Sequence, residues 1–460
     1  MSNTTIFNLS DLGISIGRIN VKSKKNNLVS VYSNTISKYY SATVTNGLSI
    51  DNVVLYDGQD NTGTQLGVLL MGETETYTIT SGYIFAEWDN PLTIGDVSFT
   101  SDGSDVGNPL RVNANKTLGL SVVTTYLTFS SNDSFTIATA NNTKNWDGIL
   151  YYSIDATTWN TWNGATINSS NNGMTKYLYI RGKNNTKITG DSTPTSNRWV
   201  LTGTNISCSG DIIRLLDYEW DYETTPTTSN YCFCGLFYNN TNLLSAPTLN
   251  RNLMQRGLYM NMFYNCESLT TAPALPSTSV QTECYSYMFS GCTSLVTAPN
   301  LPAKIMATGC YKSMFNSCTS LTIAPQLPAT TLANECYQSM FAGCTSLTTA
   351  PELHLTSLAD YCYASMFTSC TALTTPAKMG GGTSQANPTK YSCQHMYNGC
   401  TSLNIYTSAS GHTAFYKSMT YSTSSSAYNY RSTYRMFYNC KINGTTSTTN
   451  YLTAGTQYYY

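Results

Sequence analysis

Cysteine is the residue type in this chain whose number and spacing could carry chemistry. The chain has 15 cysteines, and thirteen of them lie between Cys232 and Cys400. Thiolates bind zinc, attack electrophiles and form disulfides, so a dense series could serve any of these roles. Most of these cysteines fall into two series with a spacing of 26 residues. The first series is Cys266, Cys292, Cys318, Cys344 and Cys370, and the second is Cys284, Cys310, Cys336 and Cys362.

The even spacing favours a structural role over each of these chemistries. Zinc ligands are usually paired closely in the chain, as in Cys-x-x-Cys, whereas the two series repeat one ligand type at even intervals. Cys232 and Cys234 are only two residues apart and keep zinc open as an alternative. Cys336 and Cys344 would lie about 12 Å apart on a helix, too far for a disulfide. We therefore interpret the cysteines as reduced thiols that pack as small apolar side chains.

Other residue types with catalytic potential are scarce. The three histidines occupy different positions in the repeat, and they are His354, His395 and His412. A cluster of alternating acids could supply the paired carboxylates of a glycosidase, with a plain acidic loop as the alternative. This cluster is Asp217, Glu219, Asp221 and Glu223. No nucleophile elbow, phosphate loop or His-Glu-x-x-His motif occurs. We expect no enzymatic activity, no cofactor and no metal.

The cysteines belong to a block of about 26 residues that recurs four times almost unchanged. One copy reads CYQSMFAGCTSLTTAPELHLT from Cys336. On a helical wheel, six residues share an arc of about 140°, which predicts an amphipathic helix of about three turns. They are Ala333, Cys336, Tyr337, Met340, Phe341 and Cys344. The segment 345–351 predicts a strand of two or three residues that stops at Pro351. A fixed period in this range is typical of a solenoid, here with short parallel strands on one side and helices on the other.

Stacking of such units predicts columns of identical buried side chains. Burying one side chain fully contributes roughly 1.5–3 kcal/mol, and ordering the backbone costs roughly 1–2 kcal/mol per residue, so several units must cooperate. The predicted core of the repeats is Met288, Phe289, Cys292, Leu295, Met314, Phe315, Cys318, Leu321, Met340, Phe341, Cys344 and Leu347.

The first half of the chain predicts two all-β sandwich domains. Residues 1–118 form an N-terminal β domain for particle attachment or oligomerisation, an antiparallel sandwich or small barrel with strands at 27–32, 42–44, 53–55, 76–79 and 83–88. Residues 119–220 form a second sandwich, with strands at 126–129, 134–139, 149–153, 176–181 and 198–202. Trp159, Trp162 and Trp199 are expected as core or inter-strand anchors.

The solenoid is predicted over residues 221–460. Segment 209–216 would cover its open end, because the first unit otherwise exposes apolar side chains. Asn240 replaces the ladder cysteine in an atypical first unit. Beyond Cys370 the 26-residue period breaks. Residues 403–435 are rich in Tyr, Ser and Thr, a composition similar to that of antibody binding loops. The ligand-binding candidates there are Tyr406, Tyr416, Tyr421, Tyr428 and Tyr430, with an irregular C-terminal cap as the alternative.

The pattern C-Y-x-x-M-F-x-x-C-T-S-L-T-x-A-P-x-L-P resembles the leucine-rich repeats of the Bacteroides surface protein A type, also called Treponema-type repeats. The matching residues in one copy are Phe341, Cys344, Leu347 and Pro351, and the resemblance covers about 230–440. The family unit is a few residues shorter. The segment 149–162 looks like the immunoglobulin-like β-sandwich that often precedes these repeats in gut phage and Bacteroides proteins. The resemblance implies a surface or virion protein that binds partners and has no catalytic residues.

Composition and charge limit the classes of function that the chain could have. The net charge is −1 and only 11% of residues are charged, so no basic patch indicates nucleic acid. No apolar stretch of about 18 residues predicts a membrane span, and the N-terminus lacks the features of a signal peptide. We therefore expect synthesis in a reducing cytosol.

The resulting hypothesis is a non-enzymatic bacteriophage virion protein, such as a head or tail fibre or a capsid-decorating protein, assembled in the host cytoplasm. Expected partners are other virion proteins, further copies of the chain as a homo-oligomer, and a host-surface glycan or protein. A bacterial cell-surface adhesin with the same repeats is the alternative, and an intracellular scaffold is a third.

Overall fold

Short alternating segments of the chain form β-strands, and turn residues separate them. The computed structural model divides the chain into two compact units, Met1–Thr124 and Thr125–Tyr460. In the first unit the structure describes the residues of the strands within 14–123. In the second unit it describes 126–171, 173–219, 227–249, 254–354, 358–377, 379–380, 389–408, 414–417, 434–448 and 457–459. The domain bounds 1–118, 119–220 and 221–460 stay predictions.

The first unit contains two open sheets, with strand orders β10-β7-β4-β5 and β6-β3-β11-β8-β9, and a separate pair of short strands. Its strands are β1 (Ile14–Ser15), β2 (Ser37–Lys38), β3 (Tyr40–Thr45), β4 (Val53–Asp57), β5 (Thr64–Leu69), β6 (Thr74–Ile79), β7 (Tyr83–Trp88), β8 (Asp96–Ser101), β9 (Ser104–Gly107), β10 (Leu110–Arg111) and β11 (Lys116–Val123). An added Cβ at Gly67 of β5 would lie 2.8 Å from the Tyr77 hydroxyl of β6, so the two sheets approach closely there.

The strands predicted at 42–44, 53–55, 76–79 and 83–88 are confirmed, and the one predicted at 27–32 lies outside the described residues. The expectation of a wholly antiparallel arrangement was wrong at one pair, because β11 runs parallel to β3. Several strands separate these two in the chain, so no hairpin turn forces them antiparallel. The barrel alternative is also excluded for these sheets, since neither is closed.

The second unit begins with two sheets that pack face to face. Their orders are β15-β14-β17-β12-β19-β20 and β16-β13-β18. The strands are β12 (Leu127–Ser131), β13 (Thr136–Thr139), β14 (Ile149–Ser153), β15 (Asn160–Trp162), β16 (Ile167–Asn168), β17 (Lys176–Lys183), β18 (Trp199–Thr202), β19 (Ile206–Ser209) and β20 (Leu243–Ser245). Trp162 and Trp199 lie in the shared core as predicted, with ring centroids 5.1 Å apart in a T-shaped contact.

The core of these sheets continues into the repeats without a break. Phe237, in the first repeat, has its ring centroid 6.2 Å from that of Phe129 and 5.5 Å from that of Phe263 in the next repeat. The short 3-10 helix η2 (Ile212–Leu215) covers the end of the first repeat, and all four of its residues are buried. One set of aromatic contacts spans both parts, so the described residues between Leu127 and Cys440 share one hydrophobic core.

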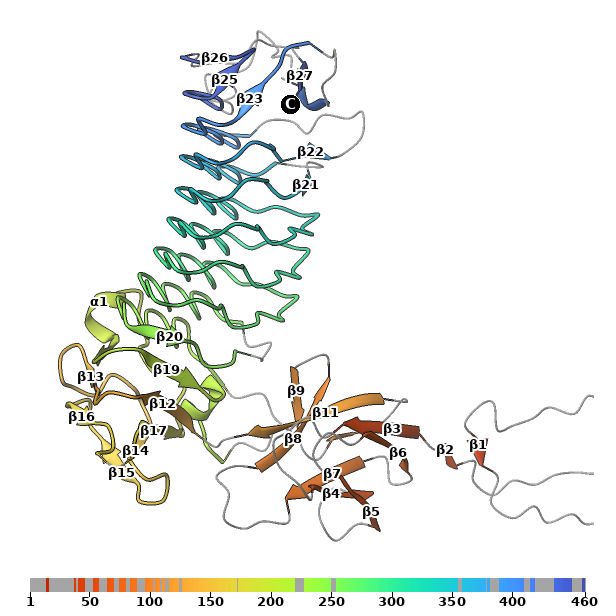
Figure 1. The fold of residues 1–460 in the computed structure, drawn as a ribbon, viewed down its shortest axis with the longest axis vertical. Helices are drawn as coiled ribbons and strands as arrows, with labels where there is room; N and C mark the ends of the chain where they lie inside the picture. The colour runs from red at the N-terminus through yellow and green to blue at the C-terminus, as the bar shows by residue number, and fades with distance from the viewer. Residues whose placement is uncertain are drawn as a thin grey trace, which may run out of the picture. The chain divides into compact units, whose positions relative to one another are not determined.

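Each repeat forms one coil of a stack, and Figure 1 shows the coils lying one upon another. The predicted amphipathic helices were wrong. In the described residues the helices are α1 (Pro194–Asn197) and η2, and neither lies in the repeated block. The segment between the two cysteine series instead forms consecutive turns, which we call the turn ribbon, residues 282–292 in one coil. Its residues Glu283, Tyr287 and Gly291 have left-handed φ values of 58°, 57° and 78°.

Backbone hydrogen bonds alternate along the turn ribbon. The Ser286 N–H donates to the Glu283 carbonyl of its own coil (3.1 Å), whereas the neighbouring Tyr285 N–H donates to the Cys310 carbonyl of the next coil (3.0 Å). The same alternation recurs in the following coils. Turns and contacts between coils therefore satisfy the buried amide and carbonyl groups that a helix would satisfy internally.

Side chains of one kind stack from coil to coil. The rings of Phe289 and Phe315 lie 5.7 Å apart at 6°, and those of Tyr285 and Tyr311 lie 5.7 Å apart at 3°. The methionine, phenylalanine, cysteine and leucine columns expected from the sequence are 0% exposed throughout. The predicted short strands are reduced to single parallel bridges such as Thr271↔Thr297 and Thr349↔Thr375.

The last coils carry several short strands. These are β21 (Leu353–His354), β22 (Met379–Gly380), β23 (Asn404–Ile405), β24 (Ala414–Lys417), β25 (Lys441–Ile442), β26 (Thr445–Thr446) and β27 (Gln457–Tyr459). β23 and β25 pair in parallel, as do β21 and β22, whereas β24 pairs antiparallel with β27. No helix among the described residues is long and apolar enough to cross a membrane.

Candidate functional site

The cysteines are structural in the described geometry. All fifteen are free and buried. The second cysteine of each turn ribbon also donates its thiol to the coil before it, as Cys318 does to the Phe289 carbonyl (3.1 Å) and Cys344 to the Phe315 carbonyl (3.1 Å). Burial raises the pKa of the Cys370 thiol to about 12, so the reactive thiolate is suppressed.

The described residues supply no further zinc ligand beside Cys232 and Cys234. Both thiols are buried, and desolvation raises the pKa of Cys234 to about 12, whereas a zinc ligand must be deprotonated. Within the described ranges no group of three or more His, Cys, Asp or Glu side chains could hold a metal ion.

The acidic cluster does not form a carboxylate pair in the described part of the chain. Glu219 forms an ion pair with Lys183 at 2.6 Å, and Asp217 accepts a hydrogen bond from the Glu219 N–H at 2.9 Å. Asp221 and Glu223 lie outside the described residues. A glycosidase pair therefore has no structural support here.

The two described histidines lie in different parts of the coils, His354 in a short strand and His395 in a later turn ribbon. His354 ends β21, and His412 lies outside the described residues. The His395 ring is half-buried, lies 3.1 Å from Asn398 Nδ2 and meets the Tyr434 ring edge-on. Burial, with a smaller effect of nearby Arg435, lowers the pKa of His395.

The predicted ligand-binding tyrosines are only partly placed. Tyr406 is half-buried, and its hydroxyl accepts a hydrogen bond from Asn404 Nδ2 at 2.7 Å. Tyr416 lies in β24, where its backbone pairs with Tyr458. The remaining candidates, Tyr421, Tyr428 and Tyr430, lie outside the described residues. Of the five candidates, the structure therefore describes the side-chain surroundings of Tyr406 alone.

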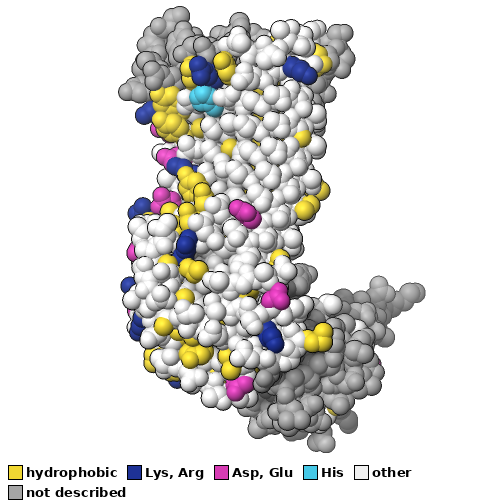
Figure 2. Space-filling view, turned by 60° about the vertical axis from the view of Figure 1, so that its left-hand side comes forward, with side chains coloured by type: hydrophobic (Ala, Val, Ile, Leu, Met, Phe, Trp, Pro, Cys, Tyr) yellow, Lys and Arg dark blue, Asp and Glu magenta, His cyan; other side chains and the backbone are white. Residues whose placement is uncertain are grey.

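The visible face of the second unit is mostly uncharged. Figure 2 shows acidic and basic side chains as isolated groups among polar side chains and backbone. Among the described coil residues, the exposed large apolar side chains are Val296, Ile305 and Ile323, which are 48%, 67% and 66% exposed. Such a surface offers a partner hydrogen-bonding groups and small apolar contacts, and it produces no strong electrostatic field.

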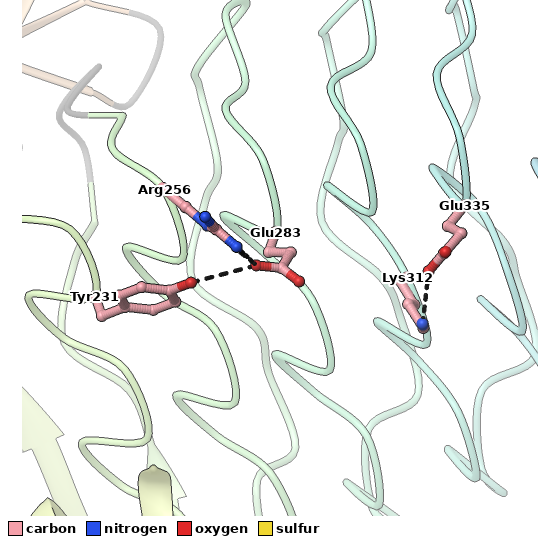
Figure 3. A network of polar contacts seen from close by, with 5 residues as sticks. All are labelled: Tyr231, Arg256, Glu283, Lys312 and Glu335. Carbon is pink, nitrogen blue, oxygen red and sulfur yellow. Dashed lines mark hydrogen bonds and ion pairs between the residues drawn. The ribbon is translucent and has the colours of Figure 1, made fainter. Parts of the chain in front are cut away.

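Charged residues of neighbouring turn ribbons pair between coils (Figure 3). Arg256 reaches Glu283 of the next coil at 3.3 Å, and the Tyr231 hydroxyl donates to the same carboxylate at 3.4 Å. Lys312 pairs with Glu335 at 2.7 Å. These partly exposed pairs contribute little energy each, but opposite charges on successive coils favour the correct register.

An arginine lies between two aromatic rings on the outer face of the six-stranded sheet. The Arg181 guanidinium carbon is 4.0 Å from the Trp159 ring centroid and 3.9 Å from that of Tyr218. Trp159 is half-buried there, so it lies outside the core, unlike Trp162, and its contacts with Tyr126 and Arg181 fit the expected alternative of an inter-strand anchor. Side chains alternate along β17, and Arg181 shares its outer face with Tyr177 and Tyr179, while Leu178 and Ile180 point into the core.

A polar pocket of about 240 Å³ opens beside this aromatic face. Its lining comes from the end of β12 and the following turn, the start of β17, β19 and β20. The lining residues are Ser130, Ser131, Asn132, Asp133, Thr175, Asn205, Ser207 and Leu244. Sequence reasoning missed this pocket because its residues come from four separate segments, and no local motif marks them. The only signal was the alternation Tyr177, Tyr179, Arg181 along one strand.

No protein-family model, curated protein or solved structure matches this chain. The function must therefore be argued from the described geometry, which offers a stack of coils joined by backbone hydrogen bonds, a nearly neutral surface and one polar pocket.

Proposed function

We propose that this chain is a non-enzymatic structural protein of a bacteriophage virion, such as a head or tail fibre or a capsid-decorating protein. Its β-rich first unit would attach to the particle or to further copies of the chain. Its coils would form a solenoid of the Bacteroides surface protein A type, with turn ribbons in place of helices, and present a surface to a host glycan or protein.

The observation that carries the proposal is the column structure of the coils. Identical Phe, Tyr, Met and Cys side chains stack without exposure, and each coil bonds to the next through backbone amides. Most of the described residues between Leu258 and Cys440 therefore serve to build a regular support with little charge. A support of this kind fits a protein that displays contact surface, and the nearly neutral exterior argues against nucleic acid.

Purified particles test the virion assignment. Phage from a culture that produces the chain would be banded in a density gradient, and peptides from 284–377 would be quantified by mass spectrometry across the fractions. We expect these peptides to follow the major capsid protein at a constant ratio. Recovery of the chain only from fractions without particles would contradict the proposal.

Deletion of the coils tests the adhesive role. Phage whose chain lacks 227–460 should still carry the first unit but adsorb to host cells more slowly than the parent. Unchanged adsorption by particles that carry the shortened chain would reject this part of the proposal.

A bacterial cell-surface adhesin is the second candidate, because the resemblance of the repeats includes bacterial surface proteins. Protease treatment of intact, phage-free cells separates the two. Release of peptides from 284–377 by this treatment would favour the adhesin, and their absence from the cell surface would favour the virion.

A further inference from the structure

The polar pocket lies where the six-stranded sheet meets the first coil. β19 and β20 pair in parallel there, with Ile206 opposite Leu243 and Ser207 opposite Ser245. Leu244 is the extra residue at this irregularity, and it lines the pocket together with Ser207. A β-bulge redirects a side chain and locally ends regular pairing, which leaves space at the sheet surface.

Several polar groups of the pocket have no protein partner. Within the described residues, the side chains of Ser130, Asn205 and Ser207 make no hydrogen bond. Asp133 Oδ2 accepts a hydrogen bond from Thr204 Oγ1, which leaves its second carboxylate oxygen without a donor in the same ranges. Two hydroxyls, an amide and a carboxylate oxygen can together donate to and accept from a ligand.

An exposed aromatic ring stands next to one of these groups, outside the pocket lining itself. Tyr177 is 37% exposed, and its position in β17 is directly opposite Ser130 of β12. Its ring is nearly parallel to that of Tyr179, at 5° and 5.9 Å between centroids. Because Tyr179 covers the ring face toward the end of β17, the other face is turned toward the start of the strand, where Thr175 lines the pocket.

The charge and size of the pocket limit the ligand. Its lining contains one carboxylate and no Lys or Arg, so it does not suit an anion. Nearby Lys176 is engaged with the carbonyls of Asn171 and Gly173. The volume of about 240 Å³ is below the roughly 300–1,000 Å³ of drug-sized pockets, which fits a single small ring.

We propose that this pocket binds one neutral pyranose unit of a glycan. One face of the sugar ring packs on Tyr177, and its hydroxyls exchange hydrogen bonds with Ser130, Asn205, Ser207 and Asp133. An aromatic platform with a few convergent polar groups supplies both the apolar contact and the orientation of a polyol. This inference deepens the proposed adhesive function and moves the ligand site from the C-terminal tyrosines to the β-sheet beside the first coil.

Saturation-transfer NMR with the purified full chain tests the site. The probes are the methyl glycosides of glucose, galactose, mannose and N-acetylglucosamine, with methyl glucuronide as the anionic comparison. The substitution Ser207→Val places a methyl group in the pocket and removes a hydroxyl, and Tyr177→Ala removes the platform. Ser209→Val is the matched control, because Ser209 lies two residues along the same strand on the same face, outside the pocket lining.

We expect saturation transfer to at least one neutral glycoside and little to the glucuronide. Ser207→Val and Tyr177→Ala should weaken binding about tenfold or more, and Ser209→Val should leave it unchanged. Should Ser207→Val fail to fold, Asn205→Gly removes a lining side chain and keeps the left-handed backbone of that position, where φ is 48°.

Three results would overturn the assignment of this pocket. They are no transfer to any neutral glycoside, a preference for the glucuronide, and binding that Ser207→Val or its substitute Asn205→Gly leaves equal to the control. None of them bears on the presence of the chain in virions, which the gradient experiment measures separately.

Discussion

At the scale of single residues, the turn ribbon depends on which side chains accept a left-handed backbone. The positions with positive φ in the coils are filled by Gly, Asn, Ser, Tyr, Glu, His and Arg, and none of the described ones carries Val, Ile or Thr. The left-handed conformation costs a non-glycine residue roughly 1–2 kcal/mol, and a branched Cβ raises this cost. The sequence of each turn ribbon therefore depends on two requirements. Some positions must accept a left-handed backbone, and others must bury an apolar side chain.

Substitutions at Ser339 test this requirement. Ser339 has a φ of 54°, is half-buried and makes no side-chain hydrogen bond in the described residues. Ser339→Gly should raise the free energy of unfolding by about 0.5–1 kcal/mol, and Ser339→Val should lower it by about 1–2 kcal/mol. Urea denaturation measures both. Ser346→Val, at a half-buried position without positive φ, is the control and should have a smaller effect. Equal effects of the two valine substitutions would show that backbone strain is not the cause.

Asn240 replaces the cysteine found at this position in the other coils, and its contacts with β18 explain the replacement. It occupies the ladder-cysteine position of the first coil, where the preceding partner is β18 rather than another coil. Its side-chain Nδ2 donates to the Trp199 carbonyl and its Oδ1 accepts from the Leu201 N–H, both at 2.8 Å. A cysteine thiol is only a weak donor and a weak acceptor, so it would be a poor replacement for either bond.

Asn240→Ala should destabilise the second unit by about 2–4 kcal/mol, because it leaves a buried amide and a buried carbonyl of β18 unpaired. Thermal and urea unfolding followed by near-UV circular dichroism would report the loss. Thr241→Ala, at an exposed neighbouring position without positive φ, is the comparison for surface effects. If Asn240→Ala lowers the free energy of unfolding by less than about 0.5 kcal/mol, the two hydrogen bonds from Asn240 to β18 do not stabilise the unit as we expect.

At the scale of elements, the coil-to-coil ion pairs act mainly on register. Lys312 and Glu335 have side chains 28% and 38% exposed, so solvent screens their interaction. A double-mutant cycle with Lys312→Ala and Glu335→Ala should give a coupling energy of about 0.2–1 kcal/mol that decreases at high salt. Lys304→Ala combined with Glu335→Ala should give no coupling, since Lys304 forms no ion pair among the described residues. A coupling energy of several kcal/mol would contradict this account, because the pair would then contribute substantially to stability and not mainly to the register of the coils.

The strands of the first half could be predicted from the sequence because alternation and turn residues are local signals. Segments 83–88 and 149–153 coincide with β7 and β14. The parallel pairing of β3 with β11 has no local signal, because it depends on where distant strands enter the sheet.

The helix prediction failed because a short helix and a turn ribbon bury similar positions. Cys336 and Tyr337, then Met340 and Phe341, then Cys344 recur every four residues, whereas a helix has 3.6 residues per turn. Over eight residues the difference is only about 80°, which a broad apolar arc tolerates. The strict four-residue period was nevertheless visible in every copy.

The candidate site was less predictable than the fold. The pocket lining comes from four segments and depends on the irregular β19–β20 pairing. No spacing in the chain encodes this juxtaposition. The tyrosines proposed from composition lie largely outside the described residues, and composition alone could not distinguish a binding loop from a cap.

At the scale of the whole molecule, the second unit depends on burying many ionisable groups in neutral form. Burial raises the pKa of Cys284 and Cys370 to about 12 from an ordinary value of 9.0. It also raises the pKa of Tyr285 and Tyr311 well above 10.0. The folded chain thus holds protons that an unfolded chain releases at high pH.

The second unit should therefore lose stability in alkali. The contribution of these groups is fully present below about pH 9 and is lost as the pH rises toward 12, because only the unfolded state then releases the protons. Each group lowers the free energy of unfolding by up to about 1.4 kcal/mol per pH unit in this range. Urea midpoints measured from neutral to alkaline pH should stay constant up to about pH 8 and then fall steeply. A midpoint independent of pH up to 11 would contradict the burial of the thiols and phenols.

The most direct test of the central claim is a crystal structure of the chain by X-ray diffraction. The account predicts positive φ at Glu283, Tyr287 and Gly291, Phe289 and Phe315 rings nearly parallel at about 5.7 Å, and reduced thiols in both cysteine series. Regular α-helices over 284–292, or disulfides between the cysteine series, would contradict it.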